Sequence, residues 1–72
     1  MTRDQYNEHL GNALRELRVE RSLTQEELAE IADLSRNHIS AVERGEKSIT
    51  VYALYRILKV LGISFGEFIE GV

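Results

Sequence analysis

Arg36 and Asn37 are neighbouring side chains whose hydrogen-bonding groups match the edges of DNA bases. An arginine guanidinium can donate two hydrogen bonds to O6 and N7 of guanine, and an asparagine amide can pair with N6 and N7 of adenine. Both residues follow Ser35, a residue type preferred at the N-cap of a helix. The first turn of one exposed helix would therefore present two base-reading groups. The alternative is a solvated helix face with no ligand.

The chain offers little chemistry for catalysis or metal binding. It has two histidines, His9 and His38, and no cysteine. No cluster of His, Cys or carboxylate residues has metal-ligand spacing, so we expect no metal site and no cofactor. Without a thiol nucleophile or a carboxylate pair in a plausible pocket, we expect no catalytic residue and no enzyme activity.

The net charge of −3 argues at first against a polyanionic partner, but the distribution of charge does not. From Leu34 to Lys59 there are five basic residues and two acidic ones, a local charge of +3, which leaves −6 on the rest of the chain. One basic segment in an acidic domain can present a positive face to DNA phosphates. A solvated surface of mixed charge fits the charge pattern alone equally well.

The sequence predicts an all-α fold in a single domain spanning residues 1–72. Capping residues and glycines divide the chain into helices at about 3–21, 25–32, 36–44 and 51–61, with a short last helix after Ser64. Capping boxes are predicted for Thr2 with Gln5, Thr24 with Glu27, and Ser64 with Glu67, and Thr50 is predicted to cap the fourth helix. No apolar run is long enough for a membrane span or a secretory signal, which predicts a cytoplasmic protein.

Apolar spacing predicts which side of each long helix is buried. The stripes are Leu10, Ala13, Leu14 and Leu17 in the first helix, and Val51, Leu54, Ile57, Leu58 and Leu61 in the fourth. Gly11 lies inside the first helix at a cost of roughly 1 kcal/mol relative to Ala. We interpret it either as a kink or as a close contact with another helix.

The second and third predicted helices are short and almost adjacent, as in a helix-turn-helix. In that arrangement the second helix of the pair enters the DNA major groove and the first braces it. Ala29 supplies the small residue needed where two helices cross closely. The apolar residues with suitable spacing to pin the pair to the rest of the domain are Leu28, Ile31, Leu34, Ile39 and Val42.

This region resembles the Cro and phage-repressor type of helix-turn-helix, also called the xenobiotic-response-element family. The resemblance covers about Leu10 to Phe68 and rests on the runs Leu23–Ala29, Leu34–Arg36, Ile39–Ser40, Glu43–Gly45 and Val51–Gly62. It implies a compact five-helix, lambda-repressor-like domain that binds a two-fold operator as a homodimer. One residue departs from the pattern: Asp33 stands where the family usually has Gly, so we expect a slightly strained left-handed turn.

The resemblance also implies roles for individual residues. The base-reading positions are Arg36, Asn37, Ser40 and Ala41, the last through a methyl contact. The phosphate-contacting candidates are Thr24, Gln25, Ser35, His38, Arg44 and Lys47. Among them His38 is nominated from its place between the base-reading residues, with a solvated side chain as the equal alternative. An ion pair between Arg18 and Glu43 is expected to fix the angle of the third helix. The structural alternatives are solvated side chains and a weak surface ion pair.

A second copy of the chain is expected, because a single module of this type covers only about 600–1,000 Å² on DNA. The resemblance places the dimer interface in the C-terminal part, about residues 50–72. The nominated interface residues are Tyr52, Tyr55, Phe65, Phe68, Ile69 and Val72. An apolar stripe is more often core than interface, but Val72 is the residue hardest to place in a monomer core.

Together these patterns predict a bacterial or phage-encoded transcriptional regulator, a repressor or an activator, of double-stranded operator DNA. RNA polymerase is a further candidate partner, and we expect no membrane and no small-molecule ligand. The run from Ser35 to Glu46 is most similar to the controller proteins of restriction-modification systems, which regulate their own operon. The alternatives are a small phage-type repressor, or an antitoxin or protein-interaction module on the same fold.

Overall fold

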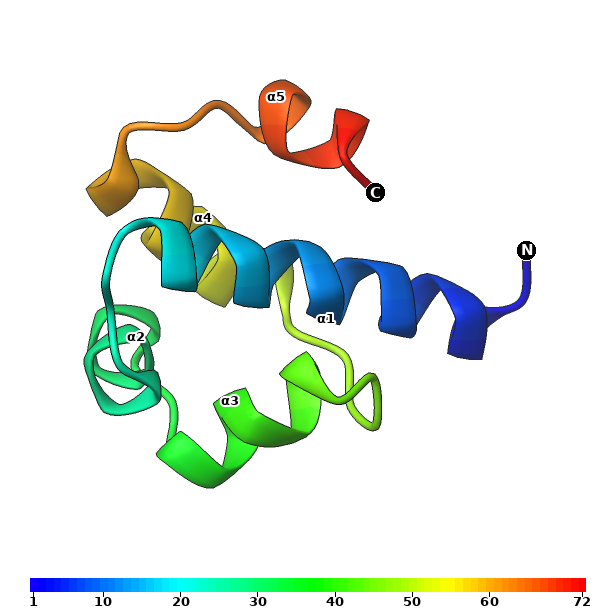
Figure 1. Ribbon diagram of the computed structural model, residues 1–72, viewed down its shortest axis with the longest axis horizontal. Helices are drawn as coiled ribbons and strands as arrows, with labels where there is room; N and C mark the ends of the chain where they lie inside the picture. The colour runs from blue at the N-terminus through cyan, green and yellow to red at the C-terminus, as the bar shows by residue number, and fades with distance from the viewer.

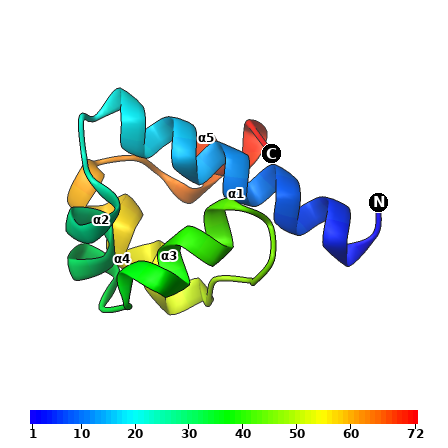
Figure 2. The ribbon, with the colours of Figure 1, turned by 60° about the horizontal axis from the view of Figure 1, so that its bottom comes forward.

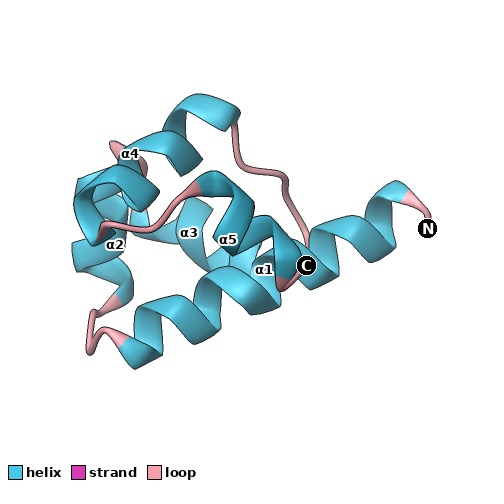
Figure 3. Cartoon of the chain, turned by 90° about the horizontal axis from the view of Figure 1, so that it is seen from above, coloured by secondary structure: helices cyan, strands magenta, loops and turns pink.

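The computed structural model describes all 72 residues as five α-helices joined by short loops, with no strand (Figures 1 and 3). The helices are α1 (Arg3–Glu20), α2 (Gln25–Ala32), α3 (Arg36–Glu43), α4 (Val51–Leu61) and α5 (Phe65–Glu70). The predicted all-α class is confirmed, and the predicted helix limits agree to within one residue. None of the five helices combines the length and the hydropathy needed to cross a membrane.

A side-chain cap begins every helix at the predicted residue. The three predicted capping boxes, at Thr2, Thr24 and Ser64, are all formed. Ser35 Oγ accepts a hydrogen bond from the backbone N–H of His38 at 3.0 Å. Each cap satisfies an N–H that has no partner inside its helix, which is worth about 1 kcal/mol. The helix limits are therefore set locally by the sequence.

Left-handed backbone conformations end or follow three of the helices. Asp33 has a φ of 58° at the end of α2, and Gly62 has a φ of 71° at the end of α4. Gly45, with a φ of 78°, follows the end of α3. The predicted left-handed turn at Asp33 is confirmed. A short polar side chain tolerates this conformation at modest cost. Ser22, between α1 and α2, adopts a φ of 58° that we did not predict.

One hydrophobic core receives side chains from all five helices. At its centre Leu14, Leu28 and Ile57 are completely buried, and burying a side chain of this size contributes about 1.5–3 kcal/mol. Around this centre α3 packs on α1 and α2, and α2 packs on α4. Val51 departs from its predicted place in the buried stripe. It is 76% exposed, because at the first position of α4 it faces a surface groove beside α5 rather than the core.

Gly11 marks the closest approach between α1 and α3. A Cβ atom built on Gly11 would lie 2.2 Å from the carbonyl oxygen of Val42, far inside van der Waals contact. Of the two interpretations offered above, the structure supports the close contact between helices. The absence of a side chain at this position therefore sets how near the C-terminal end of α3 lies to α1.

Two arginines fasten α4 to its neighbours through backbone carbonyl groups. Arg56 donates from Nε to the carbonyl oxygen of Ile31 in α2 at 2.9 Å. Arg21, the C-cap residue of α1, donates from Nη1 to the carbonyl oxygen of Leu61 at 2.7 Å. Each bond satisfies a carbonyl in the last turn of a helix, where partners inside the helix run out.

Candidate nucleic-acid interface

The helices α2 and α3 form the predicted helix-turn-helix. Three residues separate them, and the turn is closed by a hydrogen bond from the N–H of Leu34 to the carbonyl oxygen of Ala29 at 2.9 Å. Ala29 is only 4% exposed, as its predicted position between closely packed helices requires. Figures 1 and 2 show that α2 and α3 lie together on the side of α1 that is opposite α5. The α2–α3 side of the molecule is therefore open to a partner.

The first turn of α3 carries the two side chains predicted to read bases. Arg36 and Asn37 are both exposed. Ser40, one turn further along, is half-buried, and its hydroxyl accepts a hydrogen bond from Arg44. The three polar candidates thus lie on the accessible part of α3 or at its edge.

Ala41 does not fit the predicted base-reading role. The residue is only 6% exposed. The backbone after α3 folds back beside this residue, with the N–H of Glu46 bonded to the carbonyl oxygen of Ala41 at 2.9 Å. A methyl group extends one bond from the backbone and cannot reach past such neighbours. We therefore correct this prediction: Ala41 belongs to the packed side of α3.

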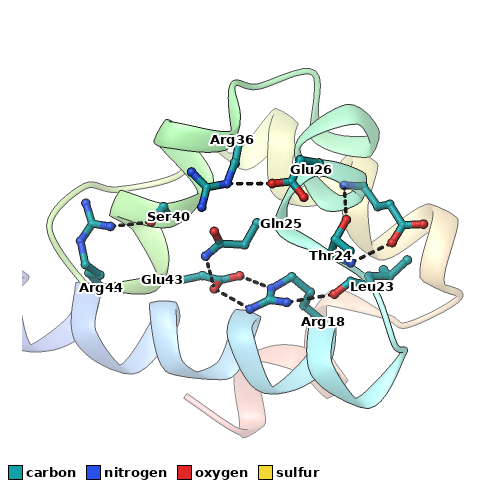
Figure 4. A network of polar contacts seen from close by, with 10 residues as sticks. Arg18, Leu23, Thr24, Gln25, Glu26, Arg36, Ser40, Glu43 and Arg44 are labelled. Carbon is teal, nitrogen blue, oxygen red and sulfur yellow. Dashed lines mark hydrogen bonds and ion pairs between the residues drawn. The ribbon is translucent and has the colours of Figure 1, made fainter.

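A buried polar network lies behind the exposed turn of α3 (Figure 4). Arg18 donates from Nε and Nη2 to the two carboxylate oxygens of Glu43, at 2.7 and 3.1 Å. Its Nη1 donates to the carbonyl oxygen of Leu23 at 2.9 Å, and Gln25 Nε2 donates to Glu43 Oε1 at 3.0 Å. The predicted ion pair is confirmed, and it joins α1 to the start of α2 and the end of α3.

Burial makes the Arg18–Glu43 pair more than a surface contact. The side chains of Arg18 and Glu43 are 14% and 3% exposed. The hydrogen bond with Glu43 raises the pKa of Arg18 above its usual value, although burial acts in the opposite direction. A charge left alone in such a place costs several kcal/mol, whereas the intact pair adds little net stability. The pair is therefore suited to holding three helices in one arrangement.

Two exposed ion pairs hold the arginines of the α3 region. Arg36 Nε lies 2.8 Å from Glu26 Oε1 in the first turn of α2. Arg44 donates from Nε and Nη2 to the carboxylate of Glu46, at 2.9 and 3.1 Å. The hydrogen bond from Arg44 lowers the pKa of Glu46 below its usual range.

Glu26 and Glu46 were not predicted from the sequence as the partners of these arginines. For Glu46 a signal existed, because a carboxylate two residues after Arg44 in a turn is within reach of its guanidinium. For Glu26 the sequence carries no such signal. The contact depends on the angle between α2 and α3, which neither helical periodicity nor spacing determines.

The residues predicted to contact phosphate surround α3 but differ in availability. The hydroxyls of Thr24 and Ser35 accept capping hydrogen bonds, so each keeps its own proton for donation. Lys47 is exposed and forms no ion pair. The ring nitrogen Nε2 of half-buried His38 lies 3.4 Å from the carbonyl oxygen of Ser48. The side chain of half-buried Gln25 already donates a hydrogen bond to Glu43.

The residues predicted for a dimer interface divide into an exposed and a buried group. Tyr52, Tyr55 and Phe65 are 63%, 55% and 52% exposed. Phe68 is 7% exposed and belongs to the core, where it lies beside α1, so we correct its assignment. Val72, expected to be the hardest of these residues to place in a monomer core, is half-buried and packs against the core. Ile69 is half-buried.

An apolar groove of about 600 Å³ lies between α4 and the start of α5. It is lined by Val51, Tyr55, Leu58, Lys59, Ile63, Ser64 and Phe65. Exposed apolar surface that is gathered in one place is typical of an interaction site. The exposed group of interface candidates overlaps this groove, whereas the buried group does not.

The five-helix fold and the exposed surface of α2 and α3 define a helix-turn-helix domain of the DNA-binding type. The family model described as helix-turn-helix, HTH_3, matches residues 14–68. This chain therefore belongs to the helix-turn-helix family of DNA-binding transcriptional regulators, as the resemblance to Cro and phage repressors predicted.

Individual relatives support the same class and include controller proteins. An uncharacterized HTH-type transcriptional regulator of Sinorhizobium fredii, y4dJ, is 37% identical over 60 residues, which cover 83% of this chain and 78% of the relative. The control protein C.MunI of a Mycoplasma species is 35% identical over 63 residues, covering 86% and 85%. Some relatives are longer: this chain spans 31% of one Escherichia coli regulator.

A solved controller structure has the same fold. The restriction-modification controller protein C.AhdI from Aeromonas hydrophila is 31% identical and superimposes with a TM-score of 0.80. The match covers 89% of this chain and 97% of that one. The predicted similarity to restriction-modification controllers is therefore confirmed.

Proposed function

We propose that this protein binds a two-fold operator as a homodimer and regulates its own operon, in the manner of a restriction-modification controller. The observation that carries the proposal is the exposure of Arg36 and Asn37 in the first turn of α3. They are free of the core, and the Arg18–Glu43 network holds the helix beneath them. The similarity to control proteins supports the controller assignment.

In this proposal Arg36 and Asn37 read base edges in the major groove, with Ser40 at the margin of the contact. Arginine is suited to guanine and asparagine to adenine. Phosphate contacts come from side chains around α3 and from the N-terminus of α2, whose free N–H groups favour an anion. The phosphate-contacting set is Thr24, Gln25, Ser35, His38, Arg44 and Lys47.

Dimerisation is proposed through the surface of α4 and α5. The apolar groove, with Tyr55 and Phe65 in its lining, supplies the contact area, and Tyr52 extends it along α4. Residues 1–72 act as one domain, and residues from about 50 onward serve both the core and the dimer. Half-sites should then lie about one helical turn of DNA apart, near 34 Å, or a multiple of that distance.

The proposal is tested by selecting binding sites from random DNA and comparing two variants on the selected operator. We expect Arg36→Ala to cost about 1–3 kcal/mol and to relax the preference at one base pair, because a bidentate base contact is lost. We expect Lys47→Ala to weaken operator and scrambled DNA alike and to reduce the salt slope by about one, because only a phosphate contact is lost.

The matched control is Arg15→Ala, which removes an exposed arginine from α1 outside the helix-turn-helix. It should leave both affinity and base preference unchanged. If the selection enriches no sequence, the sequence-specific function is wrong. If Arg36→Ala binds the operator as the wild type does, the assignment of α3 as the reading helix is wrong.

A further inference from the structure

The ion pair between Arg36 and Glu26 lies on the surface that the proposed function turns toward DNA. Glu26 is in the first turn of α2 and Arg36 is the first residue of α3, so the pair bridges the helix-turn-helix (Figure 4). Arg36 Nε and Glu26 Oε1 are 2.8 Å apart, and the two side chains are 55% and 65% exposed. The pair is therefore open to solvent and within reach of any ligand that reaches Arg36.

The geometry of the contact leaves the guanidinium able to bind a base. A guanidinium carries five N–H donors, and Glu26 contacts it beside Nε as an ion pair, without a hydrogen bond that would occupy one of them. The four N–H groups on the terminal nitrogens are left for a guanine, which needs two donors. A carboxylate beside Nε also restricts rotation of the side chain. Glu26 thus favours an Arg36 that is ordered while its terminal donors stay available.

The same carboxylate should weaken the attraction of Arg36 for phosphate. Non-specific affinity for DNA comes from cations that neutralise phosphates and release counterions. An arginine already paired with a carboxylate contributes less to this effect, and the negative charge of Glu26 lies close to the same phosphates. A guanine contact depends on donor geometry more than on net charge, so it loses less.

Glu26 is the only carboxylate of α2 that pairs with α3. Glu27 is used in the capping box, where its Oε1 accepts from the N–H of Thr24 at 2.8 Å. Glu30 is exposed and forms no ion pair. The positive end of the α2 helix also favours a carboxylate in its first turn, where Glu26 lies.

We propose that Glu26 is a specificity-determining residue, whose carboxylate holds Arg36 for guanine and lowers binding to non-operator DNA more than binding to the operator. This inference rests on the proposed DNA-binding function. It assigns to α2 an effect on base preference that does not require any contact between Glu26 and a base.

The test compares affinities for the selected operator and for a scrambled duplex of equal length, at several salt concentrations. In Glu26→Gln the freed Arg36 can neutralise one more phosphate, which corresponds to a change of about 0.9 in the salt slope. We expect affinity for the scrambled duplex to rise by up to about tenfold near 0.1 M salt. Affinity for the operator should rise less, so the ratio of the two affinities should fall severalfold.

The matched control is Glu30→Gln, which removes the same charge from the same helix without breaking an ion pair. The ratio of its affinities for the operator and the scrambled duplex should stay close to that of the wild type. In an Arg36→Gln background, Glu26→Gln should change the ratio no more than Glu30→Gln does, because its target is gone. Thermal unfolding of each variant checks that the fold is retained.

An unchanged or increased ratio in Glu26→Gln would overturn the inference, and so would an equal fall in Glu30→Gln. Failure of the proposed function itself is visible separately. In that case the wild type would show no preference for the selected operator, before any variant is made, and both proposals would fall together.

Discussion

The chemistry of the α3 surface depends on two arginines, each held by a different carboxylate. Arg36 is paired with Glu26, and Arg44 is paired with Glu46 while it also donates to Ser40. In the free protein both guanidinium groups are therefore oriented before a ligand arrives. A side chain that is already oriented loses less conformational entropy when it binds.

The pairing of Arg44 with Glu46 predicts how that carboxyl group titrates. Because the pKa of Glu46 is lowered in the folded protein, the pair stays ionised at pH values where a free glutamate is already partly protonated. Its contribution to folding is therefore present above the unfolded pKa and is lost as the pH falls through the lower, folded pKa. Carboxyl-detected NMR should show Glu46 titrating below the usual range of a glutamate.

The control for this titration is Arg44→Gln, in which the Glu46 carboxyl should return to the usual glutamate range. Equal titration of Glu46 in the wild type and in Arg44→Gln would contradict the pairing in solution.

At the scale of single residues, the sequence predicts exposure better than partners. Arg36 and Asn37 are exposed as expected, because residue type and position after a cap are local properties. Ala41 was assigned wrongly because its burial depends on how the chain folds back after α3. Glu26 was missed because its distance from Arg36 is a property of two helices and not of either sequence segment.

Among the contacts between helices, the one between α1 and α3 at Gly11 leaves no room for an added side chain. In Gly11→Ala the new Cβ would meet the carbonyl oxygen of Val42, which cannot move without moving α3. We expect a loss of about 1–3 kcal/mol in the free energy of unfolding from overpacking. This outweighs the gain of roughly 1 kcal/mol that alanine brings to a helix interior. Chemical denaturation measures the change.

Asn12→Ala is the matched control for this substitution, because Asn12 is the exposed neighbour of Gly11 on the same helix. It should be neutral or slightly stabilising. A Gly11→Ala variant at least as stable as the wild type would show that α1 and α3 do not approach this closely in solution.

The Arg18–Glu43 network predicts that stability and DNA recognition can be separated. Arg18→Ala leaves the Glu43 carboxylate buried with Gln25 as its remaining partner. We expect a loss of about 3–5 kcal/mol in the free energy of unfolding, with weaker operator binding. The double variant Arg18→Met with Glu43→Leu should recover most of the stability, because packed apolar groups replace a buried pair at little cost.

If the network orients α3, the double variant should still bind the operator less well than the wild type. Denaturation and operator titration on the same samples separate the two effects. An Arg18→Ala variant that melts like the wild type and binds the operator equally well would eliminate any structural or orienting role for the pair.

At the scale of helices, the sequence was sufficient to predict where each helix begins and ends and which residue caps it. It was insufficient to predict how the helices pack against one another. Every cap lies at its predicted residue, because capping depends on side chains three residues apart. The two interpretations of Gly11 were separated only by the position of α3. Val51 has the spacing of the apolar stripe of α4, but this stripe extends beyond the core, so Val51 is exposed.

For the whole molecule, the apolar groove between α4 and α5 predicts self-association. Tyr55→Glu or Phe65→Glu places a charge in this groove without disturbing the core, since both side chains are more than half exposed. We expect either variant to shift the molecule from dimer to monomer at micromolar concentration. Sedimentation velocity measures the shift, and circular dichroism verifies that the helices remain.

Val19→Glu is the matched control, because Val19 is also an exposed apolar residue but lies on α1 outside the groove. It should sediment like the wild type. Phe68→Ala, by contrast, should destabilise each monomer because Phe68 is buried in the core. A wild-type chain that is monomeric at these concentrations would contradict the interface.

The C-terminal helix is the part of the whole molecule that the sequence predicted least well. Its cap and position are as expected, but Phe68 and Val72 contribute to the core and not to an outer face. A helix of six residues is too short for periodicity to reveal which side is buried. That choice is made by α1, which lies beside α5 and has no sequence relation to it.

The amide of Gln25 has two hydrogens, and Glu43 takes only one of them. The second hydrogen is left for a nucleic-acid phosphate. The side chain therefore need not break its hydrogen bond to Glu43 in order to bind that phosphate. Its rotational freedom has been given up during folding and is not lost again when a duplex docks. Glu43 in α3 thus orients the Gln25 side chain of α2 for the phosphate contact proposed above.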